Sequence, residues 1–397
     1  MLRAQVIGVG AAGNKAAIKL MEDKVVGNDD ILLVNSTDKD VPEDYLKYYQ
    51  QIGDAKMSLG GCGKEPNIAK GICLQALQDG SLDLDKFIKP DTNLVIITCS
   101  TEGGTGCGAS PIIAKYLREV LGINVHVFAF LGFEEDARGL LNTVNFFKEI
   151  PEDVTVEAIR NKNFLDGRRT SYLTAEERAD HEFSVRVSIL LGNLIIPSTQ
   201  NMDDTDLFKV STQTGYMNIE YHEFDETIKN IDHFNEIVTS MIDNTKSLRP
   251  DEKSAKLLGV MINIPKKDEA SIDYSCKAIT DKYGKPFEKF MHVQSNDKIT
   301  PFIAFIVSGM DLPLDEVKGV YERYIEATTS VHKSKDDFFK SLESLDRDAS
   351  DEAFDISHKK AETSSKDSFF AGFSMQSPNR TKEATTKSSK KNIEENY

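Results

Sequence analysis

The sequence predicts an α/β protein with a Rossmann-like domain on a parallel sheet, a long core helix, a second and smaller α/β domain, and a disordered C-terminal tail. Three observations predict this organisation. Strand-like and helix-like stretches alternate over the first 150 residues, glycine-rich turns follow two of the expected strands, and a second strand and helix pattern begins at Ser254. Strands separated by helices indicate βαβ units and therefore a parallel sheet.

The expected strands of the first domain are short runs rich in β-branched residues, each followed by Gly, Asn or Ser. They are Ala4–Val9, Ile31–Asn35, Leu94–Cys99 and Val125–Leu131, with Asp153–Ile159 as a further candidate. Helical patterns lie between them at Lys15–Glu22 and Ile112–Leu121, and Ala175–Leu194 predicts a long amphipathic helix. The second domain is expected to contain strands at Ala255–Ile264 and Thr300–Ser308.

The composition is that of a globular protein without a membrane segment. The 397 residues are 40% apolar, and no apolar run approaches the roughly 18 residues that a spanning helix needs. The N-terminus leads directly into a strand, so we expect no signal peptide. Five cysteines show neither metal-ligand spacing nor disulfide-scaffold density, which favours a reducing, cytoplasmic location. The net charge of −16 argues against nucleic-acid binding by the folded body, because phosphates would be repelled.

Residues 332–397 are expected to form the disordered tail, because Ser, Lys, Asp and Thr dominate there and apolar periodicity ends. Residues 336–355 hold eight acids against two bases, whereas residues 376–391 hold five bases against one acid. The apolar island Phe369–Phe373 between these blocks is either a docking peptide, a filament contact or a linker segment without function. The basic block either contacts DNA or an acidic partner, or only keeps the tail soluble.

The first glycine-rich turn is Gly8-Val9-Gly10-Ala11-Ala12-Gly13, which follows a strand and opens a helix. Taken alone, this GxGxxG pattern is the dinucleotide fingerprint of a Rossmann oxidoreductase. It is also compatible with an ordinary strand-to-helix turn. Its glycines let backbone N–H groups approach a phosphate at a helix N-terminus.

A second turn, residues 100–111, carries four glycines within Gly103–Gly108, and Pro111 suits the first turn of the helix that follows. Backbone N–H groups in such a turn form an anion cradle. A third glycine-rich turn lies at Ser58–Lys64. Two or three cradles on one sheet suit a triphosphate better than a pyrophosphate, and the sequence has no GxxxxGK[ST] P-loop.

The segment Glu102–Gly108 resembles the GGGTG(T/S)G signature of the tubulin/FtsZ superfamily, and the resemblance continues in order from Val6 to about Asp311. Gly8–Asn14 resembles the first phosphate loop of that family, and Leu59–Lys70 its loop toward the terminal phosphate. Phe133–Arg138 is similar to the Phe-Glu-x-x-x-Arg pattern at the sugar. Glu102 occupies a position where the family has Gly, so its carboxylate needs a cation or an outward rotamer beside phosphates.

The resemblance implies a site for GTP or GDP with Mg²⁺ bridging phosphate oxygens, and no metal held by protein ligands alone. Glu134 is expected at the ribose, Arg138 near sugar and base, and Asn161 at the sugar or guanine. Asp180 and Phe183 on the long helix are the candidates that face guanine. The full set of expected nucleotide-binding residues is Gly10, Ala11, Ala12, Asn14, Asn35, Asp38, Gly61, Gly103, Gly104, Thr105, Gly106, Cys107, Gly108, Glu134, Arg138, Asn161, Asp180 and Phe183.

The segment Gly215–Glu223 is similar to the catalytic loop Gly-x-x-Asn-x-Asp-Phe-x-Asp of the bacterial members, with Glu220 and Glu223 in place of the two Asp. In this family the loop completes the nucleotide pocket of the next subunit, where its acids position and polarise the attacking water. Glu220 and Glu223 are therefore the expected catalytic residues. The segment 195–214 before them is longer than the family pattern.

These resemblances imply a GTPase that polymerises head to tail and is activated by polymerisation. The expected organisation is a nucleotide-binding GTPase domain at 1–173, the core helix and catalytic loop region at 174–253, a C-terminal α/β domain at 254–331 and the tail at 332–397. The expected role is to position or segregate plasmid or phage DNA, with an adaptor protein or phage particle bound through the tail. A division-ring protein of the FtsZ type is the alternative, and an NAD-dependent oxidoreductase is the alternative from a different class.

Overall fold

The computed structural model of the chain describes residues 2–53, 61–198, 201–224, 227–251 and 253–329, and of Arg168 only the backbone. The described strands form one ten-stranded sheet in the order β3-β2-β1-β4-β5-β6-β7-β10-β8-β9. The expected tail at 332–397 lies outside the described residues. No helix in the described ranges is both long and apolar enough to cross a membrane.

The first six strands are parallel, as the alternation of strands and helices predicts. Most of them are buried on both faces, which explains their nearly continuous apolar sequences. β1 lies between β2 and β4, so the strand order reverses beside it, and ligands of open α/β sheets bind at such a point. The bounds are β1 Ala4–Val9, β2 Ile31–Asn35, β3 Tyr49–Gln51, β4 Leu94–Ser100, β5 Asn124–Leu131 and β6 Thr155–Arg160.

The remaining strands, β7 Gly215–Glu223, β8 Leu257–Asn263, β9 Glu288–Gln294 and β10 Phe302–Met310, form a mixed continuation of the sheet. β10 is antiparallel to both β7 and β8. β7 joins the first six strands through a short parallel pairing of Thr155 and Val156 with Gly215 and Tyr216. The strands expected within 254–331 therefore share their sheet with β7, and this part of the fold begins at Gly215.

The core helix α6, Tyr172–Leu190, runs beside α1, Gly10–Glu22, and in the same direction. Lys15 contacts Glu176 at 3.3 Å, and the Ser184 hydroxyl donates to Asp23 at 2.6 Å. Asn193 then donates to the carbonyl of Val25, just beyond the end of α1. The C-terminus of α6 consequently lies at the amino edge of the parallel strands, opposite the turns that follow β1 and β4.

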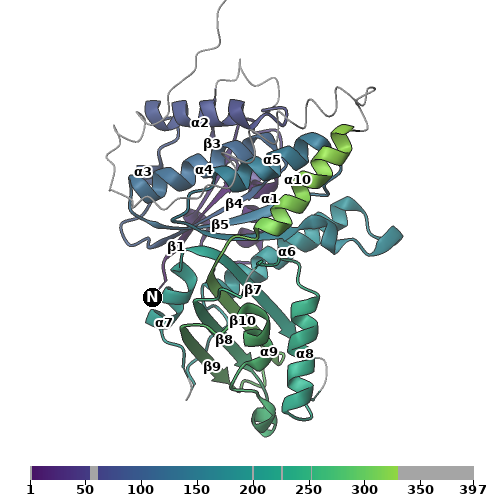
Figure 1. The fold of residues 1–397 in the computed structure, drawn as a ribbon. Helices are drawn as coiled ribbons and strands as arrows, with labels where there is room; N and C mark the ends of the chain where they lie inside the picture. The colour runs from purple at the N-terminus through teal and green to yellow at the C-terminus, as the bar shows by residue number, and fades with distance from the viewer. Residues whose placement is uncertain (1, 54–60, 199–200, 225–226, 252, 330–397) are drawn as a thin grey trace, which may run out of the picture.

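The other helices cover the two faces of the sheet (Figure 1). They are α2 Pro66–Asp79, α3 Leu84–Phe87, α4 Gly104–Glu119, α5 Ala137–Glu149, α7 Asp204–Thr212, α8 Ile231–Asp243, α9 Lys277–Tyr283 and α10 Leu314–Thr329. Short 3-10 turns occupy Asn28–Asp30, Glu43–Tyr48, Asn161–Phe164, Gly167–Arg169 and Lys266–Ser271. Pro111 lies inside α4 rather than in its first turn, because the helix begins at Gly104. One buried apolar cluster includes α2, α4 and α5, and a second includes α1, α6 and α7.

Candidate nucleotide site

The N-termini of α1 and α4 lie side by side at the carboxyl edge of the parallel strands. Neither Val9 before α1 nor Gly103 before α4 caps its helix with a side chain. Gly10 has a φ of 76°, and a Cβ placed there would lie 2.9 Å from the amide nitrogen of Gly106. The two helix starts thus approach as closely as glycine allows. Their first N–H groups and dipoles together form a site for anions.

The glycines of the second turn differ in how closely other atoms approach them. A Cβ on Gly106 would lie 2.7 Å from the carbonyl oxygen of Ser100, and one on Gly104 would lie 2.9 Å from the Cβ of Cys62. A Cβ on Gly108 would overlap the carbonyl of Pro66. At Gly103, in contrast, an added Cβ would have no atom of the described residues within 4 Å. Gly104, Gly106 and Gly108 therefore permit close packing, whereas Gly103 leaves the entrance of the cradle open.

Several buried polar groups face this edge without a protein partner. Both amide atoms of Asn14 and the Oδ1 of Asn161 are buried and have no hydrogen-bond partner among the described residues. Asn35 is buried and accepts from the amide of Ser36, whose hydroxyl lies 3.1 Å from that of Thr105. Asp38 is exposed beside them. Since a buried amide without a partner is unfavourable, Asn14 and Asn161 are suited to bind a polar ligand.

The remaining loop residues are placed as follows. Ala11 and Ala12 are half-buried in the first turn of α1. The buried Cys107 thiol donates to the Asn142 carbonyl, so its side chain faces away from the cradle. Gly61 has a φ of 128° in the third glycine-rich turn, of which residues 58–60 lie outside the described ranges.

Asp180 on α6 is a third expected residue whose side chain remains available to a ligand. Its closest basic neighbours are already paired, Lys15 with Glu176 and Lys19 with Asp23. Burial raises the pKa of the Asp180 carboxyl to about 7, against the opposing effect of Lys15. A carboxylate of this kind can accept hydrogen bonds from N–H donors of a ligand.

Phe183 is incorrectly assigned to the ligand. Its side chain is completely buried, with ring centroids 4.6 Å from Phe128 and 5.9 Å from Phe130. Both partners project from β5 into the core, and Phe183 therefore holds α6 against the sheet.

Glu102 takes the outward rotamer that its position beside a phosphate loop requires. One carboxylate oxygen accepts from the amide of Glu134 at 3.0 Å, and the side chain packs over Gly132 and Gly139. Burial raises the pKa of this carboxyl, and the neighbouring Glu134 and Asp136 act in the same direction. The carboxyl group is thereby kept out of the cradle.

Glu134 and Arg138 do not form the mutual ion pair that their spacing permits. The side chain of Glu134 is 3% exposed and is contacted by Arg160 at 2.9 Å, by Lys162, and by Arg323 at 2.9 Å. Arg138 instead pairs with Glu65. Burial raises the pKa of Glu134, but Lys162 and Arg160 outweigh it and hold the value below the ordinary one. Glu134 is thus an ionised carboxylate held by three cations.

The interpretation of Gly215–Glu223 as a loop is wrong, because these residues form β7 inside the sheet. Glu220 is 5% exposed and its carboxylate lies 3.7 Å from the guanidinium of Arg186. A buried, paired carboxylate in a central strand cannot enter the pocket of another molecule. Glu223 is exposed but ends the same strand and accepts from the hydroxyl of Tyr221.

The acidic loop after the core helix lies instead at Asn201–Asp206. Asn201, Asp203 and Asp206 have the same Asn-x-Asp-x-x-Asp spacing that the family pattern contains, and they directly precede α7. Asp203 caps α7 by accepting from the amides of Thr205 and Asp206 at 2.8 and 2.9 Å. Asn201 and Asp203 are exposed. The sequence contains this signal, which the second match at Gly215 obscured.

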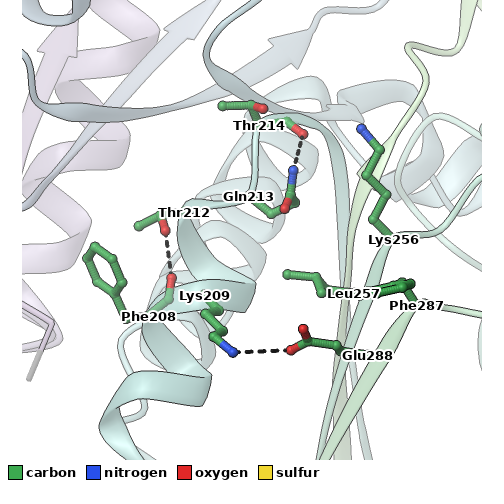
Figure 2. A pocket seen from close by; sticks show the side chains of 9 residues that line it. All are labelled: Phe208, Lys209, Thr212, Gln213, Thr214, Lys256, Leu257, Phe287 and Glu288. Atoms are coloured by element: carbon green, nitrogen blue, oxygen red, sulfur yellow. Dashed lines mark hydrogen bonds and ion pairs between the residues drawn. The ribbon is translucent and has the colours of Figure 1, made fainter.

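The acidic loop is anchored on both sides. Before it, Gln294 of β9 donates to the carbonyl of Leu194 at 3.1 Å and accepts from the amide of Ile196 at 2.9 Å. After it, α7 packs on β8, and Lys209 pairs with Glu288 at 3.2 Å in the lining of a pocket of about 660 Å³ (Figure 2). The acids at the start of α7 therefore project from a fixed platform.

The loop and the cradle lie at opposite ends of α6. A 19-residue helix is about 28 Å long, and the loop begins beyond its C-terminus. Figure 1 shows α7 near the chain N-terminus, where β1 begins, whereas the cradle follows the end of β1. The described residues also contain no cluster of three or more acids, histidines or cysteines that could hold a metal.

Comparison with known proteins finds a matching family and related folds. The family described as "Tubulin/FtsZ family, GTPase domain" matches residues 3–166, which include β1 through β6 and the turns of the cradle. A cell division protein FtsZ of Wolbachia is 25% identical over 238 residues, which are 54% of this chain and 56% of that protein. The match thus spans little more than half the length of this curated relative. It favours the GTPase interpretation of Gly8–Gly13 over the oxidoreductase one.

Two solved structures share the fold over most of the chain. TubZ from Clostridium botulinum phage c-st has a TM-score of 0.64 and 16% identity, covering 83% of this chain and 100% of that one. CetZ2 from Haloferax volcanii, a GTPγS-bound protofilament, has a TM-score of 0.62 and 20% identity, covering 83% and 99%. The resemblance therefore extends beyond residues 3–166 into the second part of the sheet.

Proposed function

We propose that the chain is a member of the tubulin/FtsZ superfamily, whose GTPase-domain family matches residues 3–166, and that it binds and hydrolyses GTP and assembles head to tail into filaments. The cradle between α1 and α4 binds the phosphates through backbone N–H groups. Asn14, Asn161 and Asp180 contribute the polar contacts to sugar and base. Mg²⁺, carried with the nucleotide, neutralises charge that develops on the phosphates.

The observation that carries assembly is the separation of the cradle from the acidic loop by the full length of α6. Asp203 and Asp206 cannot reach the nucleotide of their own chain. They can reach that of a second copy if the amino edge of one molecule stacks on the carboxyl edge of another. Such a contact is heterologous and repeats without closing, which produces a filament. Hydrolysis then depends on assembly, because each pocket is completed by its neighbour.

The test compares Asp206→Asn with the matched control Glu223→Gln. Asp206→Asn keeps an oxygen that can accept from the Asp203 amide, so the start of α7 should be retained. We expect this variant to bind GTP normally and to lose at least about 100-fold in turnover, the scale of removing one catalytic acid–base group. Glu223→Gln should turn over GTP at the wild-type rate.

Turnover per molecule should also rise with protein concentration in the wild type, and light scattering should report assembly with GTP. Two results would overturn the proposal. One is GTP hydrolysis by a monomer at a rate independent of dilution, and the other is full activity of Asp206→Asn together with loss in Glu223→Gln.

For the cellular role, we propose that the filament positions or segregates plasmid or phage DNA, with an adaptor protein or phage particle bound through residues 332–397. The segregated charge of this segment supports a partner, whereas the acidic body argues against direct DNA binding. Division-ring assembly is the second candidate, supported by the FtsZ relatives. Deletion of residues 364–397 should leave assembly in vitro unchanged and abolish binding of the partner. Loss of assembly in this variant would mean that residues 364–397 form a filament contact.

A further inference from the structure

The C-terminal helix α10 is attached to the nucleotide-binding part of the chain by charged side chains. α10 packs along α5, as Figure 1 shows, and buries Val317 and Val320. Arg323 reaches from α10 to Glu134 at 2.9 Å, and Glu316 accepts from Arg160 at 2.8 Å. Two ion pairs thus join α10 to the loop after β5 and to the end of β6.

Glu134 connects this helix to the second glycine-rich turn. Its backbone has a φ of 58°, a conformation that non-glycine residues seldom adopt, and its amide donates to the Glu102 carboxylate at 3.0 Å. The Asn142 side chain then donates to the carbonyls of both Glu102 and Lys64 at 3.1 Å. Hydrogen bonds therefore connect the loops at 64, 102 and 134 to one another, and Arg323 contacts the loop at 134.

The cations around Glu134 outnumber the carboxylates. Arg160, Lys162 and Arg323 face Glu134 and Glu316. The Nη2 of Arg160 and both the Nε and the Nη2 of Arg323 are buried without a hydrogen-bond partner among the described residues, so the contact of Arg323 with Glu134 is an ion pair without hydrogen-bond geometry. Arg323 is the member of the set that comes from outside the GTPase domain. Its removal leaves Glu134 with two cations, so the carboxylate stays ionised while its tie to α10 is lost.

We propose that Arg323 is a positioning residue through which docking of α10 on α5 and nucleotide binding reinforce each other. This inference depends on the proposed binding of guanine nucleotides. A docked α10 fixes the Glu134 loop and, through Glu102, the phosphate turn. By linkage, a bound nucleotide stabilises α10 in return. The chain continues for 68 residues beyond Thr329, so a partner that pulls on this segment would weaken nucleotide binding.

The test uses the full chain with Arg323→Gln, the rescue variant Arg323→Lys, and Lys318→Gln as control. Lys318 is exposed on the same helix, and its replacement removes the same charge. We expect Arg323→Gln to weaken binding of fluorescent GDP about tenfold, within the usual range of coupling between two sites. Arg323→Lys should restore most of the affinity, and Lys318→Gln should change it less than about twofold.

Hydrogen–deuterium exchange gives the readout that a purely structural role would not change. GDP should slow exchange in α10 of the wild type and of Lys318→Gln, but not of Arg323→Gln. Wild-type affinity in Arg323→Gln, or α10 exchange that ignores GDP in the wild type, would overturn the coupling alone. A wild-type chain that binds no guanine nucleotide would overturn the proposed function as well.

Discussion

The guanidinium of Arg186 lies 3.7 Å from the carboxylate of Glu220 in the interior between α6 and β7, where the two side chains are 0% and 6% exposed. Arg186 also contacts Glu157 of β6 at 2.5 Å and Glu182 at 2.8 Å. The guanidinium of Arg186 is therefore the counter-ion of three carboxylates, at the point where the core helix packs on both parts of the sheet. Burial raises the pKa of both Glu157 and Glu220 to about 7, against the opposing effect of Arg186, and the neighbouring carboxylates add to the rise.

Arg186→Met should be among the most destabilising single changes in the protein, because it leaves these carboxylates without a counter-ion. Breaking a buried pair in this way costs about 3–5 kcal/mol. Glu220→Gln should cost less than about 1 kcal/mol, since Arg186 keeps two partners and the amide can accept from Thr245. Denaturant unfolding of the full chain measures both changes. A larger loss in Glu220→Gln than in Arg186→Met would contradict this account.

The same cluster sets a pH dependence. A carboxyl whose pKa is raised by folding keeps its proton in the native state after the unfolded chain has lost it. Its contribution to the free energy of unfolding therefore falls as pH rises from about 4.5 to about 7. Glu220→Gln should flatten this decline, and an unchanged slope would show that Glu220 does not titrate in this range.

The sequence predicted the strands of the first domain because strands buried on both faces carry nearly continuous apolar runs, as in Leu94–Ser100. It also predicted the two glycine-rich turns, because close backbone approach leaves no alternative to glycine at Gly10 and Gly106. The sequence matched the family's loop pattern to Gly215–Glu223, which is a strand, because an Asn followed by spaced acids occurs twice. The distinguishing fact is three-dimensional: Ile219 and its neighbours pair with β10, whereas Asp203 begins a surface helix.

Other features have no signal in the sequence. The face of α6 that carries Phe183 is chosen by the packing of Phe128 and Phe130, which lie some 50 residues earlier in the chain. Likewise, Glu134 fits the sugar-binding pattern, but its contact with Arg323 depends on how α10 returns to α5. Local pattern therefore predicted which residues lie at the carboxyl edge, and tertiary packing decided which of them remain available to a ligand.

Asn14→Leu should separate stability from binding. Since both amide atoms of Asn14 are buried without partners in the described part of the chain, removing them should raise the free energy of unfolding of the nucleotide-free protein by about 1 kcal/mol. We expect the variant to bind GDP at least tenfold more weakly. The increase in the free energy of unfolding that GDP produces should therefore be smaller by at least about 1.4 kcal/mol. Thermal unfolding with and without GDP measures both effects. Lower stability combined with unchanged GDP affinity would mean that Asn14 has a structural role only.

Gly103→Val tests the entrance of the phosphate cradle. The backbone of Gly103 is extended, with a φ of −76°, and an added Cβ meets no atom within 4 Å, so folding should be unaffected. A larger side chain at that place should obstruct the phosphates and abolish the shift in melting temperature that GDP produces. Gly106→Ala is the contrasting variant, because its Cβ meets the Ser100 carbonyl oxygen at 2.7 Å and should destabilise the fold itself. Normal GDP binding by Gly103→Val would place the phosphates elsewhere.

The pH dependence of nucleotide affinity tests the role of Asp180. Only the ionised carboxylate can accept from both N–H groups of guanine, and burial raises the pKa of this carboxyl to about 7 in the free site. Below that pH, binding must first remove a proton, so affinity should fall by about tenfold per pH unit. Asp180→Asn should bind GDP weakly and without this additional slope. The exposed Glu152→Gln, in the turn before β6 and away from Asp180, should keep the wild-type profile. The phosphates of GDP titrate in the same range, and subtracting the affinity profile of Asp180→Asn from that of the wild type removes their contribution. If the difference in GDP affinity between the two proteins does not change from pH 6 to 8, Asp180 does not bind the base.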